Sequence, residues 1–231
     1  EYVIGVAGKQ GSGKSYTCNL LSNNYNFKIV SFSDKLKEYV WNGFGVKFLY
    51  KDEHLDYENC NFYPIALKNK LYFQNNLEKL MHKIFSKNKV INYLSKNKFN
   101  IIELQNLVKM YYDSHNASEM DLYARKVLQL FGTICRDIDN EIWVKKLNEK
   151  INQYLEKNEK RIAIDSVRFL NETDYVINDI PSEYKIQSEL LYIENQNQPQ
   201  RSIVRTTNYS MDKIAMQHQS EVELDNVKNY A

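Results

Sequence analysis

The sequence is poor in cysteine and lacks the residue patterns that bind structural metals. Its three cysteines, Cys18, Cys60 and Cys135, are far apart and do not have the spacing of zinc ligands. The four histidines form no HExxH motif and no other paired arrangement. We therefore expect reduced thiols, as in intracellular proteins, and no structural metal.

Long apolar runs and an excess of charge of one sign are also missing. No stretch is long enough to span a bilayer and no signal peptide opens the chain, so we expect a cytoplasmic protein without a membrane partner. The formal net charge of +2 predicts no strongly basic surface, so no nucleic-acid partner is expected. The 231 residues are 43% hydrophobic, which is enough for one core with insertions.

Short apolar runs alternate with helical stretches along the chain. We expect strands at residues 2–7, 27–32, 161–165 and 184–193. We expect helices from Tyr16, with Leu20 and Leu21 facing the core, from Lys35, at 118–131 and at 171–178. Another, capped by Asp139 or Asn140, is expected to run through Trp143 to about Leu155. Strands that alternate with helices predict an α/β fold, a parallel sheet flanked by helices with right-handed crossovers.

A glycine-rich segment follows the first expected strand and opens a helix. Residues 8–15, GKQGSGKS, match the phosphate-loop pattern GxxxxGK[ST] at every position. Glycines let backbone N–H groups converge on phosphate oxygens, and the helix N-terminus adds partial positive charge. The pattern predicts a P-loop NTPase fold that binds ATP and Mg²⁺, with Lys14 on the β- and γ-phosphates and Ser15 on the metal. The other expected nucleotide-binding residues here are Gly11, Ser12, Gly13 and Tyr16.

The phosphate loop indicates nucleotide binding but not the reaction, since GTPases, motor ATPases and small-molecule kinases share it. A short chain without an NKxD-type guanine motif favours a kinase. The residues leave three alternatives open: a kinase of the dephospho-coenzyme A or phosphomevalonate type, a nucleotide-dependent nucleic-acid-binding ATPase, and an inactive ATP-binding protein.

Several further segments share the motifs of one family. They are FSDKLK at 32–37, RKVLQLFGT at 125–133, RDID at 136–139, WV at 143–144, IDSVRFLNE at 164–172 and HQSE at 218–221. They resemble F-x-D-x-[IL]-K, R-x-x-L-Q-x-x-G-T, R-x-I-D, W-V, S-D-x-R-F-x-N-E and H-x-S-E of the deoxynucleoside monophosphate kinases of bacteriophages and large DNA viruses.

The resemblance implies transfer of the ATP γ-phosphoryl group to a deoxynucleoside monophosphate (dNMP). It implies that the dNMP is held by Lys37, Arg125, Gly132, Thr133, Arg136 and Trp143. It places Asp165 and Arg168 at a strand end that faces the transferred phosphoryl group. Structural explanations remain open: Trp143 is equally consistent with core packing, Arg125 with a solvated helix charge, and Lys37 with an ion pair to an exposed acid.

The resemblance also implies an NMP-kinase arrangement with core, acceptor-binding and lid parts. We expect one kinase domain over residues 1–231, with a helical, acceptor-binding insertion at 43–116 that includes helices at 77–85 and 99–112. A lid-like segment at 194–217 would carry Arg201 and Arg205 toward the phosphates. If the chain is viral, its compartment is the host cytoplasm. The sequence leaves open whether the chain forms a homodimer.

Overall fold

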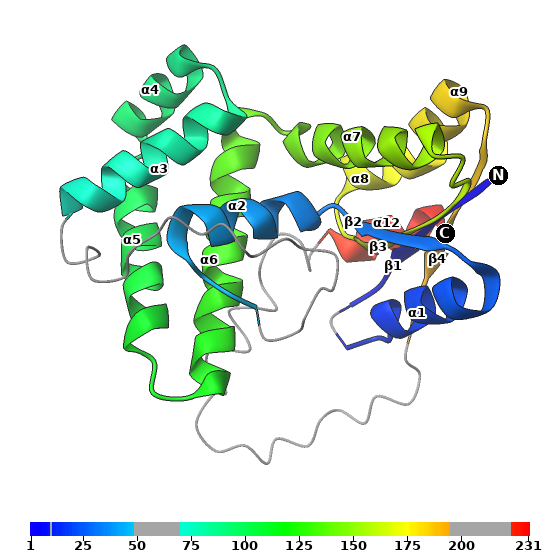
Figure 1. Ribbon diagram of the computed structural model, residues 1–231, viewed down its shortest axis with the longest axis horizontal. Coiled ribbons are helices and arrows are strands. Elements are labelled where there is room, and N and C mark those ends of the chain that lie inside the picture. The colour runs from blue at the N-terminus through cyan, green and yellow to red at the C-terminus, as the bar shows by residue number, and fades with distance from the viewer. Residues whose placement is uncertain (10, 49–69, 195–222) are drawn as a thin grey trace. The chain divides into compact units, whose positions relative to one another are not determined.

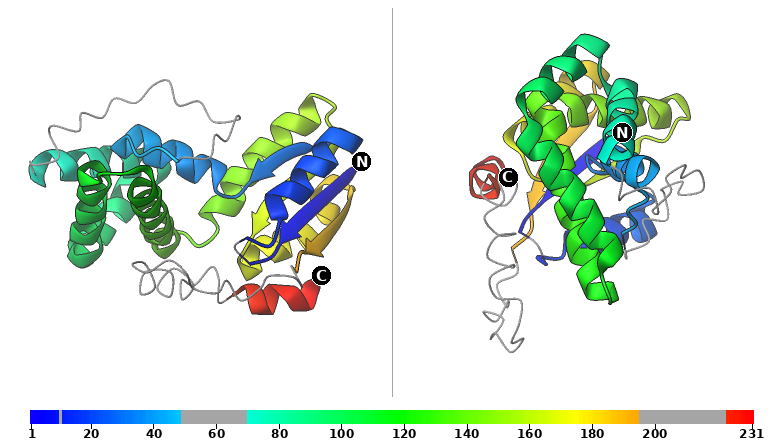
Figure 2. Two further views of the ribbon diagram at one scale, coloured as in Figure 1. Left: turned by 90° about the horizontal axis from the view of Figure 1, so that it is seen from below. Right: turned by 90° about the vertical axis from the view of Figure 1, so that its left-hand side faces the viewer.

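The computed structural model of the chain describes residues 1–9, 11–48, 70–194 and 223–231. The chain divides into two compact units, one of residues 1–32 and 144–231 and the other of residues 33–143. Among the described residues, the first unit holds the sheet and the second is helical (Figure 1, Figure 2). Arg201 and Arg205 of the expected lid lie outside the described residues.

A four-stranded parallel sheet organises the first unit. Its strands are β1 (Tyr2–Ala7), β2 (Lys28–Ser31), β3 (Arg161–Val167) and β4 (Gln187–Tyr192). They lie in the order β2-β3-β1-β4, and every pair is parallel. The expected α/β fold is therefore confirmed. The sheet brings the carboxyl ends of β1 and β3 side by side, with Val6 opposite Asp165.

Helices cover both faces of this sheet. On one face, Ile4 and Val6 of β1 form a core cluster with Cys18 of α1 (Lys14–Tyr25). On the other face, a Cβ placed on Gly5 would lie 2.9 Å from a methyl carbon of Val176. Because successive side chains of a strand point to opposite faces, α1 and the segment of Val176 cover opposite sides. That segment runs through α8 (Leu170–Asp174), the π-helical η2 (Tyr175–Asp179) and α9 (Ile180–Tyr184).

The expected inward position of Leu20 is wrong. Its side chain is 40% exposed, whereas Leu21 packs against the core cluster and Cys18 is buried. In a helix with 3.6 residues per turn, positions 18 and 21 share a face from which position 20 is turned away.

The remaining described elements of the first unit are α7 (Ile142–Glu156), α12 (Leu224–Val227) and η3 (Lys228–Tyr230). The first two residues of α7 belong to the other unit.

The described part of the second unit consists of five helices. They are α2 (Asp34–Phe44), α3 (Lys70–Ile84), α4 (Lys87–Lys96), α5 (Lys98–Asp113) and α6 (Ala117–Ile138). Their core is aromatic: the ring of Phe44 stacks on Phe73 at 5.5 Å and meets Phe131 edge-on at 5.6 Å. All three side chains are fully buried, which joins α2, α3 and α6 in one cluster.

The long helix α6 has a well-defined start. The side chain of Asn116 accepts a hydrogen bond from the Glu119 backbone N–H at 3.0 Å, and the Glu119 carboxylate accepts one from the N–H of His115 at 3.2 Å. The first bond satisfies a backbone donor of the first turn, which has no intrahelical acceptor for it, and the second ties that turn to the chain just before the helix. The cap therefore fixes the residue at which α6 begins. This start determines the face of the helix on which each later residue lies.

Candidate active site

The phosphate-loop segment joins β1 to α1, in the predicted order of strand, glycine-rich turn and helix. Gly8 has φ 144° and Gly13 has φ 102°, conformations that residues with a Cβ rarely adopt. A Cβ on Gly8 would lie 2.5 Å from the backbone oxygen of Ile193, so the loop starts in close contact with the chain after β4. A Cβ on Gly13 would meet nothing within 4 Å, so the described residues leave open space beside this part of the loop.

Lys14 lies over the loop rather than in solvent. It is 7% exposed, and its ammonium nitrogen donates to the backbone oxygens of Gly8 at 2.6 Å and Lys9 at 2.7 Å. These bonds hold a positive charge at the centre of the turn. Nearby, the hydroxyl of Ser12 is buried and has no hydrogen-bond partner among the described residues. A buried hydroxyl without a partner is costly, and a ligand rich in acceptor oxygens would satisfy it.

Ser15 and Asp165 meet at the carboxyl ends of β1 and β3. The Ser15 hydroxyl donates to Oδ2 of Asp165 at 3.0 Å, although the two residues are far apart in the sequence. The contact follows from the fold. Asp165 of β3 pairs with Val6 of β1, and the phosphate loop that leads to Ser15 begins just after Val6. The structure thus brings together the predicted metal ligand and the predicted catalytic carboxylate. Tyr16, one position further on α1, is 68% exposed.

Arg168 follows β3, and its backbone is held by Glu172, a buried acid that ends the family motif at 164–172 but had no predicted role. The Glu172 carboxylate is 3% exposed and accepts hydrogen bonds from the backbone N–H groups of Arg168 at 2.9 Å and Phe169 at 3.2 Å. A carboxylate is also stabilised by the partial positive charge at the start of a helix. Glu172 therefore fixes the backbone from which the half-buried Arg168 side chain extends.

Three of the four predicted acceptor-binding residues of α6 share one face of the helix. Arg125, Gly132 and Arg136 are separated by seven and four positions, close to whole numbers of turns, so they share one face. Arg125 donates from Nε to Asp121 at 2.8 Å and is 42% exposed. An Arg136 nitrogen lies 3.4 Å from where a Cβ of Gly132 would be. The same Cβ would lie only 3.0 Å from Cδ2 of Leu36, so glycine at position 132 lets α6 pack closely against Leu36 of α2.

The hydroxyl of Thr133 and the ring of Trp143 are both engaged inside the second unit. Thr133 donates to the Gln129 backbone oxygen of its own helix at 3.0 Å. Trp143 is 1% exposed, and its Nε1 donates to the Gly132 backbone oxygen at 3.4 Å. Because the Trp143 ring is enclosed by protein, its predicted stacking on a base stays a prediction.

Tyr39 is a candidate that the sequence analysis missed. Its ring centre is 6.5 Å from that of Trp143, and unlike Trp143 it is only half-buried. The ammonium group of Lys35, one turn earlier on α2, lies 6.0 Å from the Tyr39 ring centre. Only the four-residue spacing of Lys35 and Tyr39 signalled this contact in the sequence. Tyr39 is therefore a partly exposed aromatic ring beside the buried tryptophan.

The sequence profile of the deoxynucleotide monophosphate kinase family matches residues 2–180. The chain belongs to this family. The match covers both units of the structure and contains the residues described above, from the phosphate loop to Glu172. A search of curated proteins gave no match.

Family membership identifies the chain as a kinase that acts on deoxynucleotide monophosphates, so its substrates are small nucleotides. Nothing favours the alternative small-molecule kinases or the nucleic-acid-dependent ATPase. In the part of the kinase that the structure describes, no helix is both long enough and apolar enough to cross a membrane.

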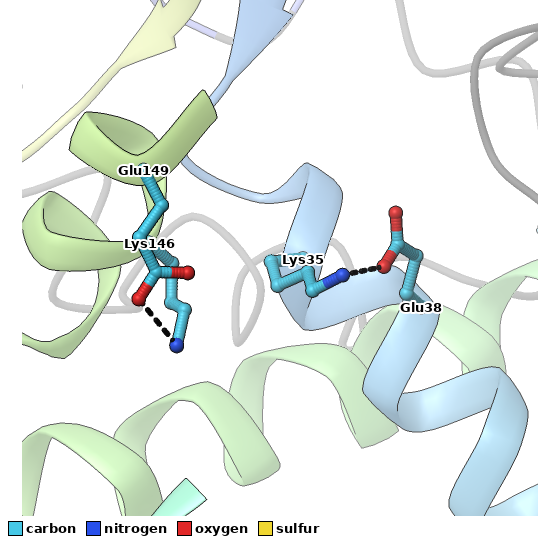
Figure 3. Close-up of polar contacts among 4 residues, drawn as sticks. All are labelled: Lys35, Glu38, Lys146 and Glu149. Carbon is cyan, nitrogen blue, oxygen red and sulfur yellow. Dashed lines mark hydrogen bonds and ion pairs between the residues drawn. The ribbon is translucent and has the colours of Figure 1, made fainter. Parts of the chain in front are cut away.

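Two other lysines of the kinase pair with a glutamate of their own helix. Figure 3 shows Lys35 with Glu38 on α2, and Lys146 with Glu149 on α7 at 2.7 Å. Such pairs, three residues apart on a helix and reached by solvent, contribute little to stability. Lys37, the predicted acceptor ligand on α2, is half-buried. In the sequence it lies between Lys35 and Tyr39.

Proposed function

We propose that this kinase transfers the γ-phosphoryl group of ATP, bound with Mg²⁺ at the phosphate loop, to the phosphate of a dNMP. The observation that supports the proposal best is the hydrogen bond from Ser15 to Asp165, beside the buried ammonium group of Lys14. It lies beyond the carboxyl ends of β1 and β3, where open parallel sheets bind their ligands.

The donor side of the site fits a nucleotide. Lys14 supplies a cation, the Ser12 hydroxyl lacks a partner among the described residues, and Gly13 leaves space beside the loop. Polyphosphate oxygens would accept from Ser12 and from the backbone N–H groups of the loop. The first turn of α1 adds partial positive charge at the same place.

The residues present also fit Mg²⁺. A serine oxygen can give a lone pair to a cation while its hydrogen is donated to a carboxylate, so the Ser15–Asp165 bond is compatible with Ser15 as ligand. Asp165 would lie beside the ion and orient Ser15. When bound, Mg²⁺ would neutralise charge that develops on the β- and γ-phosphates.

On the acceptor side, the residues of α6 would divide the dNMP between them. Arg125 and Arg136 are eleven positions apart. Eleven helical residues span roughly 16 Å, so the two guanidinium groups would reach different parts of the ligand. Thr133 already donates its hydroxyl hydrogen to its helix, so toward a base it would act as an acceptor. Lys37 would add a cation, and Tyr39 the face on which the base stacks.

The proposed reaction needs little acid–base help. A monophosphate is ionised at neutral pH and can attack without a strong general base, so the protein must align two anions and neutralise their charge. Lys14 and Arg168 would do this from the first unit, with Arg168 placing a planar guanidinium group on phosphate oxygens. Arg201 and Arg205 would complete the cationic environment from a lid, whose closure would exclude water.

An acceptor screen tests this function. ADP release would be followed in a coupled assay with ATP, Mg²⁺ and one acceptor at a time: each dNMP, each NMP, dephospho-coenzyme A, phosphomevalonate, and single- or double-stranded DNA. We expect turnover with at least one dNMP, and loss of that turnover when Mg²⁺ is chelated. Stimulation by DNA, or turnover with only a non-nucleotide acceptor, would contradict the proposal.

A further inference from the structure

The strand β3 is irregular at one residue, next to the catalytic carboxylate. β1 and β3 pair one residue with one residue as far as Val6 and Asp165. The next residue of β1, Ala7, pairs with Val167, so Ser166 has no partner in β1. This is a β-bulge, which adds one residue to one strand and redirects its side chains. Ser166 has φ 65°, the left-handed region that residues with a Cβ rarely occupy.

Ser166 differs from the other described non-glycine residues with positive φ. Asn26 and Lys185 end the helices α1 and α9, and Asn158 lies in the turn that follows α7. Left-handed residues are usual at helix ends, where they stop the helix and satisfy its last carbonyl groups. No helix ends at Ser166. Strained backbone inside a strand therefore needs another explanation, and such strain concentrates at functional sites.

The bulge changes which face of the sheet each side chain occupies. In a regular strand, Asp165 and Val167 would share the face covered by α1, and Ser166 would point to the other face. Instead, Val167 lies 3.3 Å from a Cβ placed on Gly5, which is the face covered by Val176. Ser166 is thereby free to point to the same side as Asp165, and its hydroxyl donates to Oδ1 of Asp165 at 2.9 Å.

Both oxygens of the Asp165 carboxylate are consequently held by serine hydroxyls. Ser166 donates to Oδ1 at 2.9 Å, and Ser15 donates to Oδ2 at 3.0 Å. Two hydrogen bonds to different oxygens fix the rotation of the carboxylate about its bond to Cβ. The oxygen that faces Ser15, the proposed metal ligand, is therefore set before any ligand binds.

We propose that Ser166 is a positioning residue, which uses its left-handed conformation to orient the Asp165 carboxylate toward the Mg²⁺ of the bound nucleotide. The inference rests on the proposed function, and it assigns to Ser166 a role that acts through Asp165 rather than on the substrate. Residues that orient metal-site groups in this way affect metal affinity although they do not touch the ion.

Two substitutions separate the hydroxyl from the backbone conformation. Ser166→Ala removes the hydroxyl and keeps a Cβ at positive φ, whereas Ser166→Gly removes the hydroxyl and relieves the strain. Asn158→Gly is the matched control, because Asn158 is also at positive φ but is exposed and remote from the loop in sequence. Each variant would be titrated with Mg²⁺ in two measurements: the thermal shift produced by ADP, and the steady-state rate at saturating ATP and dNMP.

We expect both Ser166 variants to need about 10-fold more Mg²⁺ for the half-maximal thermal shift and for the half-maximal rate. Without ligand, Ser166→Gly should melt at or above the unsubstituted protein. Asn158→Gly should leave the Mg²⁺ requirement unchanged. An unchanged requirement in folded Ser166→Gly would overturn the inference and make the bulge purely structural. Absence of any Mg²⁺-dependent shift in the unsubstituted protein would instead overturn the proposed function and the inference with it.

Discussion

Lys14 is the residue on which the phosphate-loop assignment depends most directly. Its ammonium group is held over the loop by two backbone oxygens, and we propose that it contacts the transferred phosphoryl group. Removing one positioned donor from a developing charge lowers kcat by on the order of 10² to 10³, and we expect this loss in Lys14→Ala. Steady-state kinetics of the purified variant would measure it. Lys146→Ala, which removes only the α7 pair shown in Figure 3, is the control and should keep near-normal kcat.

Gly8 and Gly13 both have positive φ, but the structure predicts different effects of substitution. A Cβ at Gly8 would press on the Ile193 backbone oxygen, whereas a Cβ at Gly13 would meet open space. Alanine at either position carries conformational strain of about 1–2 kcal/mol, and Gly8→Ala adds a steric cost of about 1–3 kcal/mol. Thermal and urea unfolding should therefore show a larger loss for Gly8→Ala. A loss equal to or smaller than that of Gly13→Ala would mean that the close approach at Gly8 is wrong.

The sequence singled out the residues that we propose to contact the nucleotide and its metal, but not the residues that position them. Lys14, Ser15 and Asp165 were predicted because the loop pattern and the end of a buried strand single them out. Ser166, Glu172 and Tyr39 were not. A strand pattern assumes strict alternation and cannot show a bulge, while a buried carboxylate that accepts backbone hydrogen bonds looks like an exposed helix charge in the sequence.

Among the helices, α6 contributes most to the proposed acceptor site, because it carries four of the predicted acceptor residues. The residue at which α6 begins therefore affects the site directly. Its cap can be tested at Asn116, whose side chain accepts the Glu119 N–H. Asn116→Ala should lower the free energy of unfolding by about 1 kcal/mol, the usual cost of a lost cap. Ser86→Ala is the control, because Ser86 precedes α4 without a side-chain capping bond. Urea unfolding would compare them, and equal losses would contradict a capping role for Asn116.

Element types were predicted well and element ends less well. The expected helix at 171–178 continues instead through η2 and α9 to Tyr184. Pro181 does not interrupt this segment, because it lies in the first turn of α9, where its missing N–H costs little. The strand expected from Tyr184 begins at Gln187, because Lys185 ends α9 in the left-handed conformation.

For the whole molecule, the alternation of strands and helices predicted a parallel sheet but not the order β2-β3-β1-β4. Strand order depends on which distant segments pair. β2 and β3 pair across more than a hundred intervening residues, including the entire second unit. Local patterns contain no information about such a pairing. The family resemblance nevertheless placed Asp165 at a strand end that faces the transferred phosphoryl group, which agrees with the pairing of β3 with β1.

The preference for deoxyribose over ribose depends on the assembled acceptor pocket. The free-energy cost of burying a hydroxyl limits how large this preference can be. Burying an unpaired hydroxyl costs on the order of 1–3 kcal/mol, and a pocket that only lacks a partner for a hydroxyl discriminates by about 10². We therefore expect kcat/KM to be up to about 10²-fold higher for each dNMP than for the matching NMP, so that the NMP is still used as a substrate. Steady-state kinetics with the pairs dGMP and GMP, and dUMP and UMP, would measure the ratio without changing the base. A ratio far above 10² would indicate a charged or backbone group placed against the 2′ position, whereas equal use of ribonucleotides would contradict a deoxynucleotide preference.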